Sequence, residues 1–408
     1  MSDQTQWNLV NYGRDSHITV AGRRIADCFF IIRQGKVKIP RETAIEDEKD
    51  KILVPGDFFG VASAMSSFSH IENAVAVTDV TLVTVQPRHY VSLIQKNTEI
   101  ATKVLAQLSG RLRFLNGTLA KLTRKNDQKA ASEDPSRLFD VAEYYSRNKL
   151  FSHAFYAYTK YLKHCPDGEN RKTATSQLEN LAGRAGNVKT EYANGELNRT
   201  YRKGDIIFAE GEPGDEFFVI NSGSVKISKI IDNKEVLLGT LKEGDIFGEM
   251  ALLEGKPRAA SAVASEDSTI MAASKSNFDF LIKNQPQLIY RITTLLANRI
   301  WSTFKQLEVV SINNHIGRIY AILLVQLEKS RLHLESMEPH TFSVKWEDLI
   351  NMSGLTEKDG YLLIGKLQED KNIQVLVKDG KVHVHSIRDL VMQAGLYRKI
   401  DAREKNKR

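Results

Sequence analysis

The stretch FFIIRQGKVKI, residues 29–39, recurs as FFVINSGSVKI at residues 217–227. The two copies lie 188 positions apart, and the same offset places PGDFFG, residues 55–60, on EGDIFG, residues 243–248. The match continues without a gap for roughly 85 residues, which is long for a chance similarity. The sequence therefore predicts two copies of one fold in a single chain.

Each copy predicts short strands followed by a long helix. Runs such as FFVI and SVKISKI are rich in β-formers and separated by glycines, which is typical of a rolled or closed β-structure. A helical period of apolar residues follows in the second copy, and we interpret residues 278–307 as a dimerisation helix. Packing of this helix on its own barrel is the alternative. Its apolar stripe comprises Ile292, Leu295, Leu296, Ile300, Phe304 and Leu307.

Between the copies, residues 136–190 predict a helical insert. The alternation of small and large residues typical of one tetratricopeptide repeat occurs at Leu138, Ala142, Tyr145, Ala154, Tyr158 and Pro166. One repeat cannot bury its apolar face alone, so residues 172–185 are expected to form a capping helix. A plain helical hairpin used as a spacer remains the alternative to a peptide-binding role.

The second copy carries a short cassette, FGEMALL at residues 247–253 followed by PRAAS at residues 257–261. It resembles the phosphate-binding cassette of cyclic-nucleotide-binding domains, such as those of protein kinase A regulatory subunits and the Crp/Fnr family. A cyclic phosphate needs a charged donor with fork geometry, which an arginine supplies, and small residues that let backbone N–H groups approach. The predicted ligand-binding residues are Gly248, Glu249, Met250, Ala251, Arg258, Ala259, Ala260, Ser261 and Thr303.

The resemblance also implies individual roles and a ligand. Glu249 is expected to accept a hydrogen bond from the ribose 2′-hydroxyl. Ala259 stands where a threonine favours cyclic GMP in the family, so cyclic AMP is expected here, with cyclic GMP or another cyclic nucleotide as the alternative. Thr303 falls where Crp proteins have a threonine that contacts adenine. No cofactor and no metal are expected besides this ligand.

The first copy, residues 1–122, departs from the cassette. Val61 replaces the glutamate, His70 falls where Arg258 does, and Glu72 would repel a phosphate. A valine cannot bind a hydroxyl group. The first copy is therefore interpreted as a degenerate domain kept for packing or dimerisation, with a rebuilt site for another ligand as the alternative.

Residues 313–395 resemble the winged helix-turn-helix of Crp/Fnr regulators. Residues 346–352 and 357–369 predict its two helices, and a hairpin with Asp-Gly at its tip predicts the wing. Residues 310–397 hold 10 Lys+Arg and 11 Asp+Glu, whereas a DNA reader is usually basic. Residues 396–408 read as a basic tail. The resemblance implies DNA-contacting positions at Thr356, Glu357, Lys358, Lys366, Lys378 and Lys381.

Composition narrows the class of protein. The 408 residues include 57 Lys+Arg and 50 Asp+Glu, for a net charge of +7, which permits anionic partners without showing them. Only two cysteines occur, no apolar leader opens the chain and no apolar run is long enough to span a membrane. No catalytic constellation appears, so we predict a cytoplasmic protein that is not an enzyme.

Together these features predict an α+β multidomain protein. Two cyclic-nucleotide-binding β-rolls, the second over residues 195–309, flank the tetratricopeptide-like insert, and a winged helix-turn-helix follows. The first functional hypothesis is a cyclic-AMP-responsive transcription regulator of the Crp/Fnr type. The second is a nucleotide-gated adaptor or regulatory subunit whose winged helix no longer binds DNA and whose insert binds a protein. A sensor of another nucleotide, such as a cyclic dinucleotide, is the remaining hypothesis.

Overall fold

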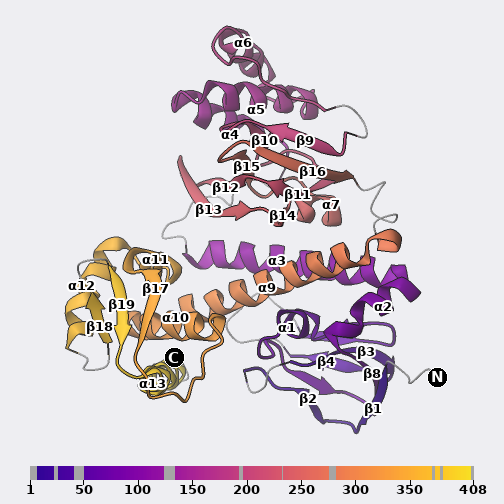
Figure 1. The fold of residues 1–408 in the computed structure, drawn as a ribbon, viewed down its shortest axis with the longest axis vertical. Coiled ribbons are helices and arrows are strands. Elements are labelled where there is room, and N and C mark those ends of the chain that lie inside the picture. The colour runs from indigo at the N-terminus through magenta and orange to yellow at the C-terminus, as the bar shows by residue number, and fades with distance from the viewer. Residues whose placement is uncertain are drawn as a thin grey trace. The chain divides into compact units, whose positions relative to one another are not determined.

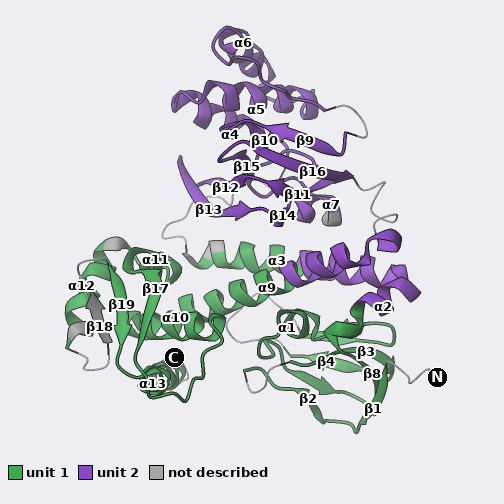
Figure 2. Cartoon of the chain, in the orientation of Figure 1, with its two compact units in different colours: residues 1–90, 111–126, 296–408 green, residues 91–110, 127–295 purple. Residues whose placement is uncertain are grey.

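The chain forms two compact units, drawn in separate colours in Figure 2. The first unit comprises residues 1–90, 111–126 and 296–408, and the second comprises residues 91–110 and 127–295. The computed structural model describes residues 7–22, 26–40, 50–123, 134–192, 196–231, 233–274, 282–369, 373–376 and 380–405.

In the first unit, the N-terminal copy is a roll of two antiparallel sheets, with strand orders β1-β8-β3-β6 and β2-β7-β4-β5 (Figure 1). The strands are β1 (Asn8–Tyr12), β2 (His17–Thr19), β3 (Phe29–Gln34), β4 (Val37–Ile39), β5 (Lys51–Leu53), β6 (Phe58–Phe59), β7 (Ala74–Ala76) and β8 (Val80–Val85). The helical elements of this copy are α1 (Val61–Ser66), η1 (Pro87–His89), α2 (Tyr90–Lys96) and α3 (Thr98–Thr123).

In the second unit, the other copy repeats this arrangement, with strand orders β14-β11-β16-β9 and β10-β15-β12-β13. The strands are β9 (Asn198–Tyr201), β10 (Ile206–Phe208), β11 (Glu216–Ser222), β12 (Ser224–Ile231), β13 (Lys234–Lys242), β14 (Ile246–Phe247), β15 (Ser261–Ala264) and β16 (Ser268–Ser274). Its helices include α7 (Glu249–Glu254) and α9 (Pro286–Val310), of which residues 286–295 belong to the second unit and residues 296–310 to the first.

The repeat predicted from the sequence is confirmed element by element. Helices α1 and α7 begin at residues 61 and 249, and helices α3 and α9 begin at residues 98 and 286, so both pairs keep the offset of 188. The start predicted for the last helix, residue 278, lies outside the described residues, whose helix α9 begins at Pro286. Each roll encloses its own apolar core, because alternate strand residues point inward.

The apolar stripe of α9 is covered within one chain. Five of its six members are at most 3% exposed, and Leu295 is half-buried. The sequence predicted a homodimer because the stripe was too extended for one barrel face. That reason no longer holds, since the stripe has partners in the chain itself. The buried members are Ile292, Leu296, Ile300, Phe304 and Leu307.

The partner in the first unit is the other copy. Thr303 of α9 lies 3.4 Å from Asn116 of α3, measured between the hydroxyl and the side-chain carbonyl oxygen. These residues are 187 positions apart, so nearly equivalent points of the two repeated helices meet. In addition, Trp301 stacks on Phe68 with ring centroids 4.0 Å apart. The first copy therefore packs against the C-terminal half of α9.

The insert folds as three helices on the second roll, α4 (Arg137–Arg147), α5 (Phe151–His164) and α6 (Arg171–Leu181). Of the residues in the predicted alternation, Pro166 is exposed and the other five are buried, namely Leu138, Ala142, Tyr145, Ala154 and Tyr158. Helix α6 covers most of the predicted capping segment. The insert does not have a core of its own. One buried cluster joins its side chains to Ile206, Ala209, Ile230 and Val263 of the roll.

In the first unit, the C-terminal part begins with α10 (His315–Lys329), whose N-cap Asn314 accepts a hydrogen bond from the Gly317 amide at 3.0 Å, as the sequence predicted. A three-stranded sheet of order β17-β19-β18 follows with its helices. These elements are β17 (His340–Lys345), α11 (Trp346–Met352), α12 (Glu357–Gln368), β18 (Ile373–Leu376), β19 (Lys381–Val384) and α13 (Ile387–Lys405).

The segment predicted as a basic tail is mostly helix. Helix α13 continues to Lys405, and Asp401 within it is buried and accepts a hydrogen bond from the Asn313 amide at 2.7 Å. Tyr397 stacks on Tyr320 of α10. The prediction was wrong because it rested on the many charged residues of this segment, which gave no sign of the residues that α13 buries. Those residues contact Asn313 and α10 at the junction between α9 and α10. Among the described residues, no helix has the length and apolarity needed to cross a membrane.

Candidate functional site

Arg258 lies at the centre of the cassette of the second roll. Its backbone pairs with a loop between β10 and β11, because its amide donates to the Glu212 carbonyl at 2.8 Å and its carbonyl accepts from the Gly211 amide at 2.9 Å. Its guanidinium lies against two aromatic rings, 4.4 Å from the centroid of Phe208 and 5.3 Å from that of Phe218. The side chain is therefore held from both ends inside the roll.

Two hydrogen bonds from the guanidinium to backbone carbonyls both come from one of its nitrogens. Nη1 donates to the carbonyl oxygens of Glu216, at 2.8 Å, and of Gly248, at 2.6 Å. Nε is buried and has no hydrogen-bond partner among the described residues, and neither carbonyl contact uses Nη2. The edge formed by Nε and Nη2 is the one with which arginine binds two oxygens of a phosphate or carboxylate in parallel. Burial lowers the pKa of Arg258, and nearby carboxylates, Glu212 first, oppose that effect.

Gly214 permits this placement by its size alone. A Cβ atom on Gly214 would lie 2.3 Å from Nε and 2.4 Å from Cζ and Nη2 of Arg258. Gly248 is constrained twice, by a φ of 75° and by Arg258 Nη1 at 2.8 Å from its would-be Cβ. Both glycines let the backbone approach the arginine directly.

We expect Gly214→Ala to weaken ligand binding about tenfold, which corresponds to about 1.4 kcal/mol, with a smaller effect on folding. The added methyl group must push the guanidinium off its carbonyl contacts, and a side-chain end moves more easily than the fold. Titration calorimetry and thermal unfolding measure the two effects separately. Gly239→Ala is the control, because a Cβ there meets nothing within 4 Å. Equal ligand affinity in the two variants would contradict this role for Gly214.

The other predicted residues of the cassette lie together around Arg258. Gly248 is the N-cap of α7, and Glu249 and Ala251 at its start are each 2% exposed. Ser261 is buried at the start of β15, and its hydroxyl accepts from the Glu210 amide at 2.9 Å. Met250 is half-buried in α7, while Ala259 is exposed and Ala260 buried directly after the arginine.

Thr303 is placed in the first unit, where its contact is Asn116. The adenine contact that the family resemblance implied for Thr303 therefore stays a prediction.

In the first copy, the corresponding positions serve internal contacts. Glu72 forms an ion pair of 3.3 Å with Arg111, and its carbonyl accepts from the Thr19 hydroxyl at 2.9 Å. The carbonyl of His70 accepts from the Gly22 amide. These contacts agree with the interpretation of a copy kept for packing.

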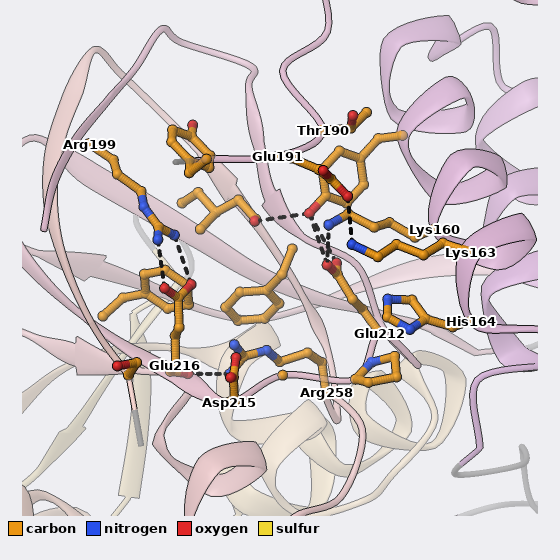
Figure 3. A pocket seen from close by; sticks show the side chains of 18 residues that line it. Lys160, Lys163, His164, Thr190, Glu191, Arg199, Glu212, Asp215, Glu216 and Arg258 are labelled. Carbon is orange, nitrogen blue, oxygen red and sulfur yellow. Dashed lines mark hydrogen bonds and ion pairs between the residues drawn. The ribbon is translucent and has the colours of Figure 1, made fainter. Parts of the chain in front are cut away.

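A cavity of about 490 Å³ borders Arg258 on the side of the insert (Figure 3). Most of its lining comes from helix α5, residues 190–192, and the loop with its flanking strands from residue 207 to 218, and Arg199, Arg258 and Ser274 complete it. Figure 3 shows Lys160, Lys163 and His164 reaching toward it from the insert. The charges are balanced in pairs, since Lys163 lies 2.5 Å from Glu191, and the two terminal nitrogens of Arg199 lie 2.8 and 2.6 Å from the carboxylate of Glu216.

Sequence reasoning missed Gly214, Phe208 and the contribution of the insert. A comparison of the two copies could have indicated Gly214 and Phe208. At the offset of 188, Gly214 corresponds to Ala26 and Phe208 to Val20, so both change together with the change from arginine to His70. The insert has no counterpart in the first copy, and no such signal exists for it.

The residues predicted to contact DNA lie at the ends of α12 and β19. Thr356 is the N-cap of α12, where its hydroxyl accepts from the Asp359 amide at 3.2 Å and donates to the Asp359 carboxylate at 2.5 Å. Lys358 and Lys366 are exposed and Lys381 is half-buried. The backbone of Glu357 begins α12, and Lys378 lies outside the described residues.

The family described as cyclic nucleotide-binding domain matches residues 9–97 and 198–285, one match in each copy. A cyclic AMP receptor protein of Thermus thermophilus is 28% identical over 174 residues, which are 42% of this chain and 77% of that protein. A cAMP-dependent protein kinase regulatory subunit of Debaryomyces hansenii is 38% identical over 102 residues, 25% of this chain and only 22% of the subunit. The crystal structure of the Thermus thermophilus catabolite activator protein aligns at 25% identity over 49% of this chain and 90% of that chain, with a TM-score of 0.27.

These relatives are named as regulators of two kinds. One is a cyclic AMP receptor protein, and the other is the regulatory subunit of a protein kinase. The matched domains, together with relatives named for cyclic AMP, fit a cyclic AMP ligand and no metal cofactor. Arg258 stands only in the second copy, and His70 takes the corresponding position in the first. The chain thus contains two cyclic nucleotide-binding domains, of which the second has kept the charged cassette.

Proposed function

We propose that this protein is a cyclic-AMP sensor that regulates transcription in the manner of the Crp/Fnr family. The second roll binds the nucleotide, and α9 transmits binding to a C-terminal winged helix. A ligand shifts such an equilibrium only by its differential affinity for the two states. The junction between α9 and α10 is the element we expect to respond.

One observation carries the ligand assignment. Arg258 is 6% exposed and fully held by carbonyls and aromatic rings, yet its Nε remains without a hydrogen-bond partner among the described residues. A buried donor left unpaired costs free energy, about 1–3 kcal/mol for such a group. A cyclic phosphate bound at the Nε–Nη2 edge removes this cost and places the ribose toward Glu249.

The exposed Ala259 supports cyclic AMP over cyclic GMP. We expect Ala259→Thr to raise the affinity for cyclic GMP about fivefold, because one added hydrogen bond contributes about 1 kcal/mol. The hydroxyl would meet the 2-amino group of guanine, and adenine has no amino group at that position. Competition between the two nucleotides measures the change, with Ala259→Val as the isosteric control. Equal gains in the two variants would attribute the effect to shape instead of to the hydroxyl.

The regulator proposal requires that the C-terminal part binds DNA. The arrangement of α11, α12 and the β18–β19 hairpin supports a winged helix, with α12 as the recognition helix. The cations predicted to contact DNA are few, namely Lys358, Lys366, Lys378 and Lys381. We therefore expect a shallow salt dependence, in which log affinity falls against log salt with a slope no steeper than about −4 per domain, at about −0.9 for each neutralised phosphate.

Gel-shift titration with genomic fragments, with and without cyclic AMP, tests this function. A shift that depends on cyclic AMP supports the regulator. Glu357→Arg should strengthen nonspecific binding, since it replaces a repelling carboxylate with a phosphate-binding group at the start of α12. If no fragment shifts at low salt with saturating cyclic AMP, the transcription-regulator proposal fails.

A second function is favoured by the surface of α12. Tyr361 is 53% exposed and Leu362 is 66% exposed on this helix, and Leu362 stands where Crp proteins offer an arginine to DNA. Exposed apolar side chains are typical of protein contacts. A nucleotide-gated adaptor or regulatory subunit is therefore the alternative, with the tetratricopeptide-like insert as a further contact surface. A homodimer through residues 278–307 stays a prediction under either function.

A further inference from the structure

The loop at residues 209–216 joins the insert to the cassette. On one side it pairs with the backbone of Arg258 through Gly211 and Glu212, and it holds the Arg258 guanidinium through the Glu216 carbonyl. On the other side, two of its four acidic side chains, Glu210 and Glu212, point to the insert. The loop therefore stands between the helices of the insert and the phosphate-binding arginine.

Each of the two acidic side chains meets a buried cation of the insert. Lys160 of α5 lies 2.9 Å from Glu212, and Arg137 of α4 lies 3.2 Å from Glu210. All four side chains are at most 12% exposed. Ion pairs this deeply buried are sensitive to the loss of either partner, because the other charge is then left without compensation.

Glu212 is the more tightly held of the two. The Tyr156 hydroxyl donates to its carboxylate at 3.0 Å, and the Ala209 amide donates to the same oxygen at 3.0 Å. Burial raises the pKa of the Tyr156 hydroxyl, and the Glu212 carboxylate raises it further, so the phenol remains a donor. Figure 3 shows Lys160 reaching the Glu212 carboxylate from the insert.

We propose that the insert forms part of the nucleotide site, with Lys160 and Tyr156 as positioning residues that set the place of Arg258 through Glu212. This inference rests on the proposed binding of cyclic AMP at Arg258. The docked insert keeps the Glu212 carboxylate paired with Lys160 and Tyr156. Without Lys160, that carboxylate competes with the phosphate for Arg258. By reciprocity, bound nucleotide strengthens docking of the insert by the same factor.

Titration of cyclic AMP into four purified full-length proteins tests the proposal: wild type, Lys160→Met, Glu212→Gln and the double variant. We expect Lys160→Met to weaken binding at least tenfold. The double variant should regain most of the loss, because the carboxylate that competes for Arg258 is then absent. Lys160→Arg should bind within about threefold of wild type, since it preserves the charge.

Lys172→Met is the matched control. Lys172 lies on α6 of the insert, is exposed, and is not among the described residues that line the cavity. This variant should bind like wild type. If Lys160→Met also binds within twofold of wild type, the inference is overturned while the nucleotide function stands. If wild type itself takes up no cyclic AMP, the proposed function fails and the inference fails with it.

Hydrogen exchange of the wild-type protein provides a second measurement that does not depend on the variants' folding. Saturating cyclic AMP should slow exchange of the α5 amides, and Arg258→Ala should abolish that slowing. If Lys160→Met does not fold, Tyr156→Phe takes its place as the test variant. It removes only a hydroxyl group and should weaken binding about threefold. Unchanged exchange in α5 with saturated nucleotide would refute coupling between the insert and the cassette.

Discussion

Arg258→Ala should weaken cyclic AMP binding by more than a hundredfold. The substitution removes a charge-assisted bidentate contact, worth about 3 kcal/mol, and a hundredfold change corresponds to about 2.7 kcal/mol. Arg258→Lys keeps the charge without the fork and should lose less. Titration calorimetry measures the affinity and also the stoichiometry, which we expect to be one nucleotide per chain.

Two controls accompany this variant. Arg291→Ala removes an arginine from the same unit that also donates to a backbone carbonyl, that of Gly244 at 2.6 Å, but stands outside the cassette. His70→Ala changes the position that corresponds to Arg258 in the first copy. Both should bind cyclic AMP like wild type. A stoichiometry of two, or a loss of one site in His70→Ala, would refute the degenerate nature of the first copy.

Leu296→Glu should destabilise the folded chain by about 4 kcal/mol or more, because a fully buried leucine is replaced by a charge that has no partner. Leu296 is 0% exposed within one chain. Denaturant unfolding measures the change in the free energy of unfolding, and light scattering measures the mass of the folded species. Asn298→Glu, on the exposed side of the same helix, is the control and should be nearly neutral.

This variant also distinguishes the two possible partners of the α9 stripe. If the stripe served only as an interface between two chains, Leu296→Glu would give a folded monomer of normal stability. The burial of the stripe within one chain leads us to expect unfolding instead. A stable variant of half the wild-type mass would restore the homodimer interface predicted from the sequence.

The sequence by itself determined the features that depend on near neighbours or on the repeat. The offset of 188 located equivalent strands and helices in both copies, since identical local patterns fold alike. The caps at Asn314 and Thr356 were also readable, because each side chain bonds to an amide only three residues further on. The cassette could be recognised because phosphate binding needs a small set of residue types at a short spacing.

Only the tertiary structure decided which surfaces meet. The α9 stripe shows that a helix needs an apolar partner, but the pattern is the same for a second chain and for α3 of the same chain. Glu212 reads as an ordinary charged loop residue until α5 brings Lys160 to within 2.9 Å of it. Residues 396–405 look like a solvated basic end until Asp401 is found beneath Asn313. Such contacts join residues far apart in the chain, and no local pattern encodes which distant partner the fold will supply.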